Sequence, residues 1–386
     1  ARGAALRSAG GVGARTGRVA GAESLLLRAL EVFRDAGDLR AQGLVLGELG
    51  VLAMETGRPR DGEARLCEAL AVHRRVLNRE AEGVALSNLA VVLQQTGQVG
   101  QARKQLEAAL AIHQEVGNRP YEGQALASLG VQLRHEGRPA ESRVLLARAL
   151  AIHRRFGHRA EAGRVLGFQA DADRDAGRVA EAEAGYAEAL RIHREVQDRG
   201  KQGYVLGSLA TLYQNTGRLA EAAEAFRQSL ALLREAGNLR TEGVILGNLG
   251  RLSFETGRPA QAIAECEQAV AIHREVGNRR SEGIVLDNLA TMYDSTGRTV
   301  ESDRAAAQAL VIHREIRNRP HEATHHCSRA LVFLRRGQVA AARRSWKEGN
   351  TILSTLGDPA GLAAHRAEMR EACERAGVRP FPGTGP

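Results

Sequence analysis

The chain has 386 residues, a formal net charge of +9 and only 3% aromatic residues. No apolar run approaches the roughly 20 residues that a membrane-spanning helix needs, and the N-terminus lacks the charged-then-apolar pattern of a secretory signal. These features exclude a membrane-spanning protein and favour a cytoplasmic one. The 54 basic residues against 45 acidic ones keep nucleic acids and acidic proteins among the candidate partners.

The cysteines and the first residue give two further expectations. Cys67, Cys266, Cys327 and Cys373 are scattered without any short pair spacing. Because disulfide frameworks and zinc sites need such spacing, we predict neither a metal nor a cofactor. The chain opens at Ala1, within a repeat pattern and without a methionine, so we expect that further sequence precedes it.

Glycines recur every forty residues along almost the whole chain. They are Gly17, Gly57, Gly97, Gly137, Gly177, Gly217, Gly257, Gly297 and Gly337. A strict period of this length is typical of a solenoid, in which each unit buries its apolar face against the next. We therefore predict an all-α solenoid, with a partial or degenerate repeat over residues 1–40 and eight forty-residue repeats over residues 41–360.

The repeat at residues 281–320 contains two amphipathic segments. Apolar residues recur at helical spacing in residues 282–293 and again in residues 302–316, which predicts two helices, A and B. Gly297 lies between them and can adopt the left-handed backbone conformation that ends a helix without steric cost. The same conformation after helix B is expected for Asn78, Asn118, Asp198, Asn238, Asn278 and Asn318.

Small residues occupy one position in each helix. In helix A they are Gly50, Ala90, Gly130, Ala170, Ala210, Gly250, Ala290 and Ala330. In helix B they are Ala22, Ala102, Ala182, Ala222, Ala262 and Ala342. We expect the two helices of a repeat to approach most closely at these positions, because a larger side chain would wedge them apart.

These residues resemble a known pattern. Leu249-Gly250, Gly257, Ala262 and Ala269, with Tyr186 or Phe226 at the aromatic place of helix B, are similar to the tetratricopeptide repeat. The forty-residue length and the Gly-Asn-Arg link resemble the long-repeat type of kinesin light chain and Pins, and of bacterial signalling proteins. The resemblance covers nearly the whole chain and implies a right-handed superhelix of stacked helix pairs, whose A helices line a concave groove.

Several residues depart from this pattern. Phe168, Gln169 and Asp173 replace a small polar residue, a leucine and an aromatic residue, so the A helix near residues 161–176 is expected to carry an altered inner surface. In the last full repeat, His326 and Arg329 stand at leucine places.

The C-terminal segment is expected to close the array. Residues 361–376 resemble the capping helix that covers the last apolar face of a solenoid. Residues 377–386 contain three prolines and three glycines, and we predict a disordered tail there.

The resemblance also implies which residues bind a partner. The place before the Leu-Gly pair holds Asn88, Asn248 and Asn288, whose amides can pair with a peptide backbone, although such asparagines can also simply face water. The other groove-facing places hold Gln95, Arg134, Arg174, Tyr204, Gln214, Asn215, Arg251, Phe254, Asp287 and Asp294. The arginines are expected to pair with acidic groups of a peptide, and the two aspartates to favour a basic patch on the partner.

One place in helix B carries a column of histidines. They are His73, His113, His153, His193, His273 and His313. Successive repeats separate them by about 10 Å, whereas histidine nitrogens bind a metal at about 2.1 Å, so they cannot share an ion. We expect a packing or helix-capping role, with pH sensing as the alternative.

Residues His321-Glu322-Ala323-Thr324-His325 match the H-E-x-x-H zinc motif. The match is weakened because Glu322 is the glutamate that most repeats carry at this place. Ser328 and Leu331 also stand where the longer zinc-protease pattern has glycine and histidine. We therefore predict no catalytic residue and no functional metal site, with adventitious metal binding as the alternative.

These observations support one main function and two alternatives. The main hypothesis is a non-catalytic scaffold that binds a peptide or helix of a partner protein in the concave groove. The first alternative is a sensor segment of a larger bacterial signalling protein, such as an ATPase, kinase or transcription regulator. The second is nucleic-acid binding through arginines, which is weakened because many arginines have acidic neighbours in the sequence. Neither the partner nor the oligomeric state can be read from the sequence.

Overall fold

A computed structural model describes residues 2–15, 19–56, 58–96, 98–316, 318–356 and 359–383, and for a few of them, Gln95 included, only the backbone. Within these residues the chain contains nineteen α-helices and no strand, which confirms the all-α prediction. The helices form two compact units, Ala1–Ile245 and Leu246–Pro386, and the boundary between the units lies inside α13.

The helices have nearly uniform lengths and follow one another at short intervals. Those of unit 1 are α1 (Arg2–Arg15), α2 (Val19–Asp35), α3 (Leu39–Glu55), α4 (Pro59–Arg75), α5 (Arg79–Gln95), α6 (Val99–Glu115), α7 (Arg119–His135), α8 (Pro139–Arg155), α9 (Arg159–Asp175), α10 (Val179–Glu195), α11 (Arg199–Asn215) and α12 (Leu219–Glu235). After α13 (Leu239–Glu255), those of unit 2 are α14 (Pro259–Glu275), α15 (Arg279–Ser295), α16 (Thr299–Glu315), α17 (Arg319–Arg335), α18 (Val339–Leu356) and α19 (Pro359–Arg375).

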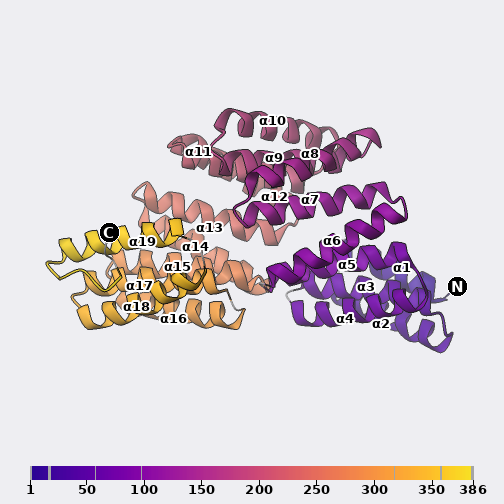
Figure 1. The fold of residues 1–386 in the computed structure, drawn as a ribbon, viewed down its shortest axis with the longest axis horizontal. Coiled ribbons are helices and arrows are strands. Elements are labelled where there is room, and N and C mark those ends of the chain that lie inside the picture. Colours follow the sequence, from indigo (N-terminus) through magenta and orange to yellow (C-terminus); the bar gives the residue numbers. More distant parts are fainter. Residues whose placement is uncertain are drawn as a thin grey trace. The chain divides into compact units, whose positions relative to one another are not determined.

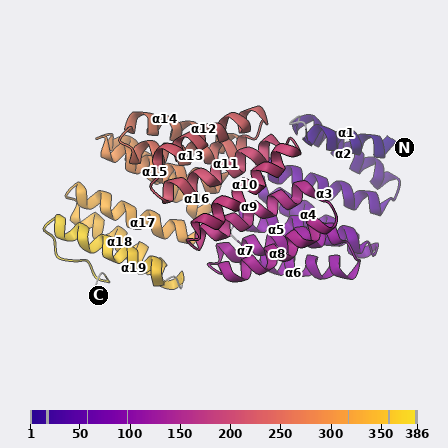
Figure 2. The same ribbon diagram turned by 90° about the horizontal axis from the view of Figure 1, so that it is seen from above.

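Neighbouring helices form antiparallel pairs that lie side by side within each unit (Figures 1 and 2). The odd-numbered helices from α3 to α17 are the predicted A helices, the even-numbered ones from α4 to α18 are the B helices, and α1 and α2 form a further pair. Gly217 and Gly297 join A to B with φ angles of 77°, as the left-handed prediction requires. Gly17, Gly57 and Gly97 lie outside the described residues.

The asparagines between repeats act differently from the expectation. Asn118 has a φ angle of −79°, outside the left-handed region, and its Oδ1 accepts a hydrogen bond from the backbone N–H of Tyr121 at 3.4 Å. Gly117 takes the left-handed conformation instead, with φ of 70°. The side chains of Asn78, Asn118, Asp198, Asn238 and Asn278 therefore cap the N-terminus of the following A helix, whereas Asn318 makes no such hydrogen bond.

The positions predicted for close helix contact are buried. Ala222 on α12 is 0% exposed, and a Cβ added at Gly250 on α13 would lie 2.5 Å from Sγ of Cys266 on α14. Ser229 on α12 donates a 2.6 Å hydrogen bond to the carbonyl oxygen of Gly203 on α11, which shows how closely the backbones approach. The small side chains therefore set the spacing of the helix pairs.

Replacing Ala222 with phenylalanine is expected to destabilise unit 1 by about 1–3 kcal/mol, because the ring must force apart helices that are already in contact. Each repeat in a solenoid is supported by its neighbours, so we expect the loss to spread over several repeats. Amide hydrogen exchange should show reduced protection in α10 and α11 as well as in α12. Faster exchange confined to α12 would contradict this prediction.

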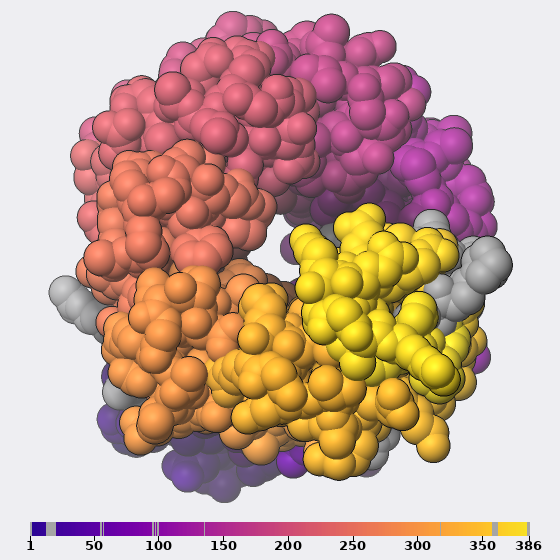
Figure 3. All heavy atoms as spheres, turned by 90° about the vertical axis from the view of Figure 1, so that its left-hand side faces the viewer, coloured from indigo at the N-terminus to yellow at the C-terminus, as the bar shows by residue number. Residues whose placement is uncertain are grey.

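The C-terminal helix α19 packs against α17 and α18, and in Figure 3 the yellow C-terminal segment lies directly against the orange helices before it. The chain remains packed beyond this helix. Phe381 is 2% exposed, and the indole N–H of Trp346 donates to the carbonyl oxygen of Pro382 at 3.1 Å. The segment predicted to be a disordered tail therefore covers the apolar end of the repeats as far as Pro382, while residues 384–386 lie outside the described residues.

Candidate functional site

Polar side chains of three A helices meet in unit 1. Asp171 on α9 is 2% exposed. Its carboxylate accepts hydrogen bonds from the hydroxyl groups of Tyr186 at 2.7 Å and Tyr204 at 3.2 Å. Arg174, one turn further along α9, places Nη1 3.2 Å from the same carboxylate. Burial and the charge of Asp171 raise the pKa of Tyr204, so its hydroxyl group stays protonated and donates.

A second carboxylate links this group to α7. Asp175 accepts from Nη1 of Arg134 at 2.6 Å and from Nη2 of Arg174 at 2.9 Å. Burial would raise the pKa of Asp175, but hydrogen bonding to Arg134 and the charge of Arg174 keep the pKa below its usual range. The two arginines are therefore already paired with two aspartates. They are less available for an acidic partner than their sequence positions suggested.

One hydrogen-bond donor of this cluster remains without a partner. Nε of Arg134 is buried and has no acceptor within the described parts of the chain. A buried N–H group without an acceptor is costly, because it has lost its water without gaining a protein partner. We call Arg134, Asp171, Arg174, Asp175 and Tyr204 the α7–α9–α11 cluster.

Three of these residues, Arg134, Arg174 and Tyr204, were predicted from the repeat pattern, and the structure brings them together. The two aspartates were not predicted. Asp171 stands where the three preceding repeats have valine, at 51, 91 and 131, and this change from an apolar to a charged residue was the signal that could have identified it.

The other predicted residues of unit 1 lie on α5 and α11. Asn88 is half-buried on α5, Gln214 is buried near the end of α11, and Asn215 is exposed beside it. The side chain of Gln95 lies outside the described residues.

In unit 2 the predicted residue Asp287 on α15 is bound by histidines of its own chain. Its carboxylate lies 2.9 Å from Nε2 of His313 and 2.6 Å from Nδ1 of His325. Burial would raise the pKa of Asp287, but the hydrogen bonds of the two imidazoles lower it. The side chain keeps 24% of its surface exposed.

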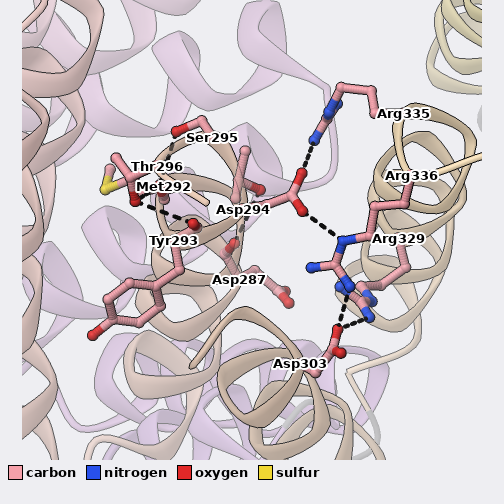
Figure 4. Close-up of polar contacts among 11 residues, drawn as sticks. Asp287, Met292, Tyr293, Asp294, Ser295, Thr296, Asp303, Arg329, Arg335 and Arg336 are labelled. Carbon is pink, nitrogen blue, oxygen red and sulfur yellow. Dashed lines mark hydrogen bonds and ion pairs between the residues drawn. The ribbon is translucent and has the colours of Figure 1, made fainter. Parts of the chain in front are cut away.

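Asp294, also on α15, lies between Arg335 and Arg336 in Figure 4, at 3.0 and 2.7 Å from their guanidinium nitrogens. Nη1 of Arg336 lies 2.9 Å from the carboxylate of Asp303 on α16, and this carboxylate also lies 2.7 Å from Nη2 of Arg329 on α17. This chain of ion pairs ties α15, α16 and α17 together. Asp294 is thus paired with two arginines and Asp287 is hydrogen-bonded to two histidines, so neither presents the open acidic surface that was expected for a basic partner.

The remaining predicted residues of unit 2 are half-buried on A helices. Nη1 of Arg251 lies 2.8 Å from Oε1 of Glu255, one turn further along α13. Asn248 and Phe254 lie on the same helix, and Asn288 lies on α15 beside Asp287.

The histidine column is buried, which confirms the expected packing role. His113, His153 and His193 are at most 1% exposed. A Cβ added at Gly123 would lie 2.7 Å from Nε2 of His153, so this imidazole occupies space that the glycine of the A helix in the same pair leaves open. Among the described residues, no group of three histidine, cysteine, aspartate or glutamate side chains could hold a metal ion.

The carboxylate in the H-E-x-x-H segment has a structural role. Glu322 is bound by Nε of Arg314 at 3.0 Å and by Nη1 of Arg319 at 2.7 Å, and its side chain is only 6% exposed. One repeat earlier, Glu282 is bound in the same way by Arg274 and Arg279. The carboxylate therefore joins consecutive helices and is not directed at a water molecule between His321 and His325.

Stacked helix pairs with polar side chains gathered on successive A helices define a helical-repeat protein of the kind that binds other polypeptides. The sequence matches the tetratricopeptide repeat over residues 81–155, 161–235 and 241–312, more than half of its length. The chain belongs to the tetratricopeptide repeat family. Repeats of this family typically bind proteins or peptides and are generally non-catalytic. No curated protein sequence matches the chain.

Several solved structures share the fold. A Rap protein, crystallised in complex with competence and sporulation factor, is 12% identical with a TM-score of 0.64, and the match covers 94% of this chain and 99% of the Rap chain. Aspartyl phosphate phosphatase F from Bacillus subtilis is 11% identical with a TM-score of 0.55, covering 91% and 94%.

A signal transduction ATPase with numerous domains from Pyrococcus horikoshii, which carries a tetratricopeptide repeat sensor, is 14% identical with a TM-score of 0.56. The match covers 92% of this chain but only 50% of the ATPase chain. None of the helices in the described residues combines the length and the apolar character that crossing a membrane requires.

Proposed function

We propose that the chain is a non-catalytic scaffold that binds an extended segment or a helix of a partner protein along the A helices α7, α9 and α11. The observation that carries this proposal is the buried Nε–H of Arg134, which lacks an acceptor while the rest of the α7–α9–α11 cluster is paired. The Arg134 side chain keeps 13% of its surface exposed, so a small shift of its guanidinium would let a carbonyl or carboxylate oxygen of a bound polypeptide supply that acceptor.

The surroundings of this donor fit a peptide better than a small ion. Phe168 on α9 is half-buried, and the guanidinium of Arg164 lies 5.5 Å from the centre of its ring. An apolar side chain of the partner would pack on Phe168, while polar groups of its backbone face the cluster. Asn88, Asn248 and Asn288 are proposed to bind the partner's backbone at the equivalent place of other repeats.

Site-specific photocross-linking tests this proposal. Ser128 on α7 and Ser208 on α11 occupy the position equivalent to Asn88 and are half-buried, so p-benzoylphenylalanine placed there would face the bound segment. We expect both positions to cross-link the same partner in cells, with cross-linked residues that mass spectrometry assigns to one short segment.

Arg191 on the B helix α10 provides the matched control, since its side chain is 57% exposed on the other helix of a pair. p-Benzoylphenylalanine at this position should give no cross-link to the partner segment that Ser128 and Ser208 contact. Equal cross-linking from Arg191, or none from Ser128 and Ser208, would show that the A helices of unit 1 are not the binding face.

A second candidate is a sensor segment of a larger signalling protein. It is favoured by the similarity to the ATPase with a tetratricopeptide repeat sensor, of which this chain covers half the length. The complete gene sequence tests this candidate directly. A nucleotide-binding or DNA-binding domain encoded next to the repeats would support a sensor, whereas an open reading frame that contains only repeats would support the scaffold alone.

Nucleic-acid binding has less support, because the guanidinium groups are extensively paired with carboxylates. Arg79, for example, contacts both Glu82 and Glu115 at 2.6 Å. A nucleic-acid complex would lose affinity steeply between low and moderate salt, since it forms by release of counterions.

A further inference from the structure

The tyrosines of two repeats occupy the same place between consecutive B helices. Tyr293 at the end of α15 points to α14, where its hydroxyl donates to Oε1 of Glu267 at 2.5 Å. The guanidinium of Arg298, from the following turn, lies over its ring at 4.4 Å from the centre. Tyr213 has the same arrangement with Arg218, at 4.1 Å. In these two repeats an arginine therefore covers an aromatic ring at this place.

The repeat of α9 lacks this ring. Asp173 stands at the tyrosine position, forty residues before Tyr213. Instead of covering a ring, Arg178 places Nη2 2.7 Å from Oδ1 of Asp173, and Nε of Arg143 lies 3.4 Å from the same oxygen. The arginine that lies over a ring in the repeats of Tyr213 and Tyr293 is thus held by a carboxylate here, beside an open space.

The space is an open pocket of about 450 Å³ on the B-helix side of unit 1. Ala140, Val144 and Ala147 of α8 form its wall, Gln169 of α9 lines it at a place where most other repeats have leucine, and Arg143 and Arg178 lie at its rim. Ala147 occupies the position of Glu267, the residue that the Tyr293 hydroxyl reaches. The volume lies within the roughly 300–1,000 Å³ of pockets that hold small ligands.

We propose that this pocket, which we call the α8–α9 pocket, binds an aromatic side chain of a partner polypeptide. The incoming ring would take the place that Tyr213 and Tyr293 fill in their own repeats. This contact is separate from the proposed binding along the A helices, because its wall belongs to a B helix.

Three properties of the pocket match an aromatic residue. Val144 is 60% exposed, so its methyl groups are available for contact with an incoming ring. Arg143 and Arg178 share one carboxylate oxygen, so their guanidinium groups carry a surplus positive charge that is attracted to the face of a ring. The half-buried amide of Gln169 has no hydrogen-bond partner among the described residues, and can pair with a phenol or with the backbone of the incoming residue.

A titration with N-acetyl-tyrosinamide, followed by methyl NMR, tests the proposal on the whole chain. We expect the Val144 methyl signals to shift and saturate in the millimolar range, and to show nuclear Overhauser contacts to the ring protons. N-acetyl-leucinamide, which has no ring, should produce shifts at least several-fold smaller. A wild-type titration in which Val144 does not respond, or responds equally to both compounds, would overturn the proposal without any variant.

Asp173→Tyr should fill the pocket in the way that Tyr213 and Tyr293 do in their own repeats, so the variant should lose the Val144 response while its circular dichroism stays helical. Asp173→Asn removes the charge but leaves the space open, and this control should keep the response. Binding that survives in Asp173→Tyr, or that disappears equally in both variants, would show that the tyrosine analogue does not occupy this place.

Discussion

Lowering the pH from about 7.5 to about 5 is expected to destabilise unit 1 strongly, because its buried histidines are held in the neutral form. Burial lowers the pKa of His73, His113, His153 and His193 below the usual 6.5. Below that value the unfolded chain takes up protons that the folded chain does not. Stability is therefore full above about pH 6.5 and falls as the pH drops towards the lowered pKa values.

The surroundings of His153 show why the folded protein resists protonation. Both of its ring nitrogens are buried without a hydrogen-bond partner among the described residues. Burial is the main cause of the lowered pKa, the charges of Arg164 and His158 add to it, and only Glu161 opposes it. Each such histidine contributes at most about 1.4 kcal/mol per pH unit, so several together produce a large loss. Thermal unfolding at a series of pH values measures this loss.

The chain supplies its own control for the histidine column. The repeat of α11 and α12 has Leu233 at the histidine position, 0% exposed and packed against Gly203. A variant with leucine at His113, His153 and His193 should remain folded at neutral pH and lose stability less steeply between about pH 6.5 and pH 5. If this variant and the wild-type protein lose stability in parallel, other groups cause the acid sensitivity.

The forty-residue period was sufficient to predict the helices, because each turn glycine is required by the backbone conformation of its own turn. Gly217 and Gly297 adopt positive φ angles that other residues rarely take, so their spacing reports the helix ends directly. The small residues at the helix contacts are equally informative, since the carbonyl oxygen of Ala262 lies only 3.0 Å from where a Cβ at Gly250 would be.

The pairing of charges could not be predicted in the same way, because it depends on contacts between repeats. Arg134 reaches Asp175 across 41 residues, and Asp294 is bound by Arg335 and Arg336, also more than forty residues away. A repeat pattern places these residues on A helices or, for Arg336, in the turn after one, but it does not show which charges neutralise each other. Arg134 and Arg174 were therefore expected to bind a peptide, although in the structure both are paired with Asp175.

The C-terminal segment was misjudged for a related reason. Its glycines and prolines favour disorder locally, but Phe381 is a single aromatic residue with an apolar surface within reach. Its 2% exposure and its cluster with Trp346, Met369 and Cys373 show that burial of one ring outweighs the local preference.

Replacing Trp346 with alanine is expected to destabilise unit 2 by about 3–5 kcal/mol, because it removes the largest side chain of this cluster and leaves a cavity. Trp346 is 1% exposed, and its N–H binds the carbonyl oxygen of Pro382. Trp346→Phe keeps much of the buried area and should cost much less, with about 1 kcal/mol due to the lost hydrogen bond. Chemical denaturation followed by circular dichroism measures both losses.

Phe381→Ala separates the contribution of the terminal segment from that of the helices. Trp346 is the only tryptophan of the chain, so its fluorescence reports on this cluster alone. If the segment packs on the cluster, removal of the Phe381 ring admits water to the indole, so its emission shifts to longer wavelength while the helical content is retained. Unchanged emission and unchanged stability in this variant would mean that the helices, including α19, bury Trp346 without the terminal segment. In that case the cost of Trp346→Ala would arise from packing between α17, α18 and α19 alone.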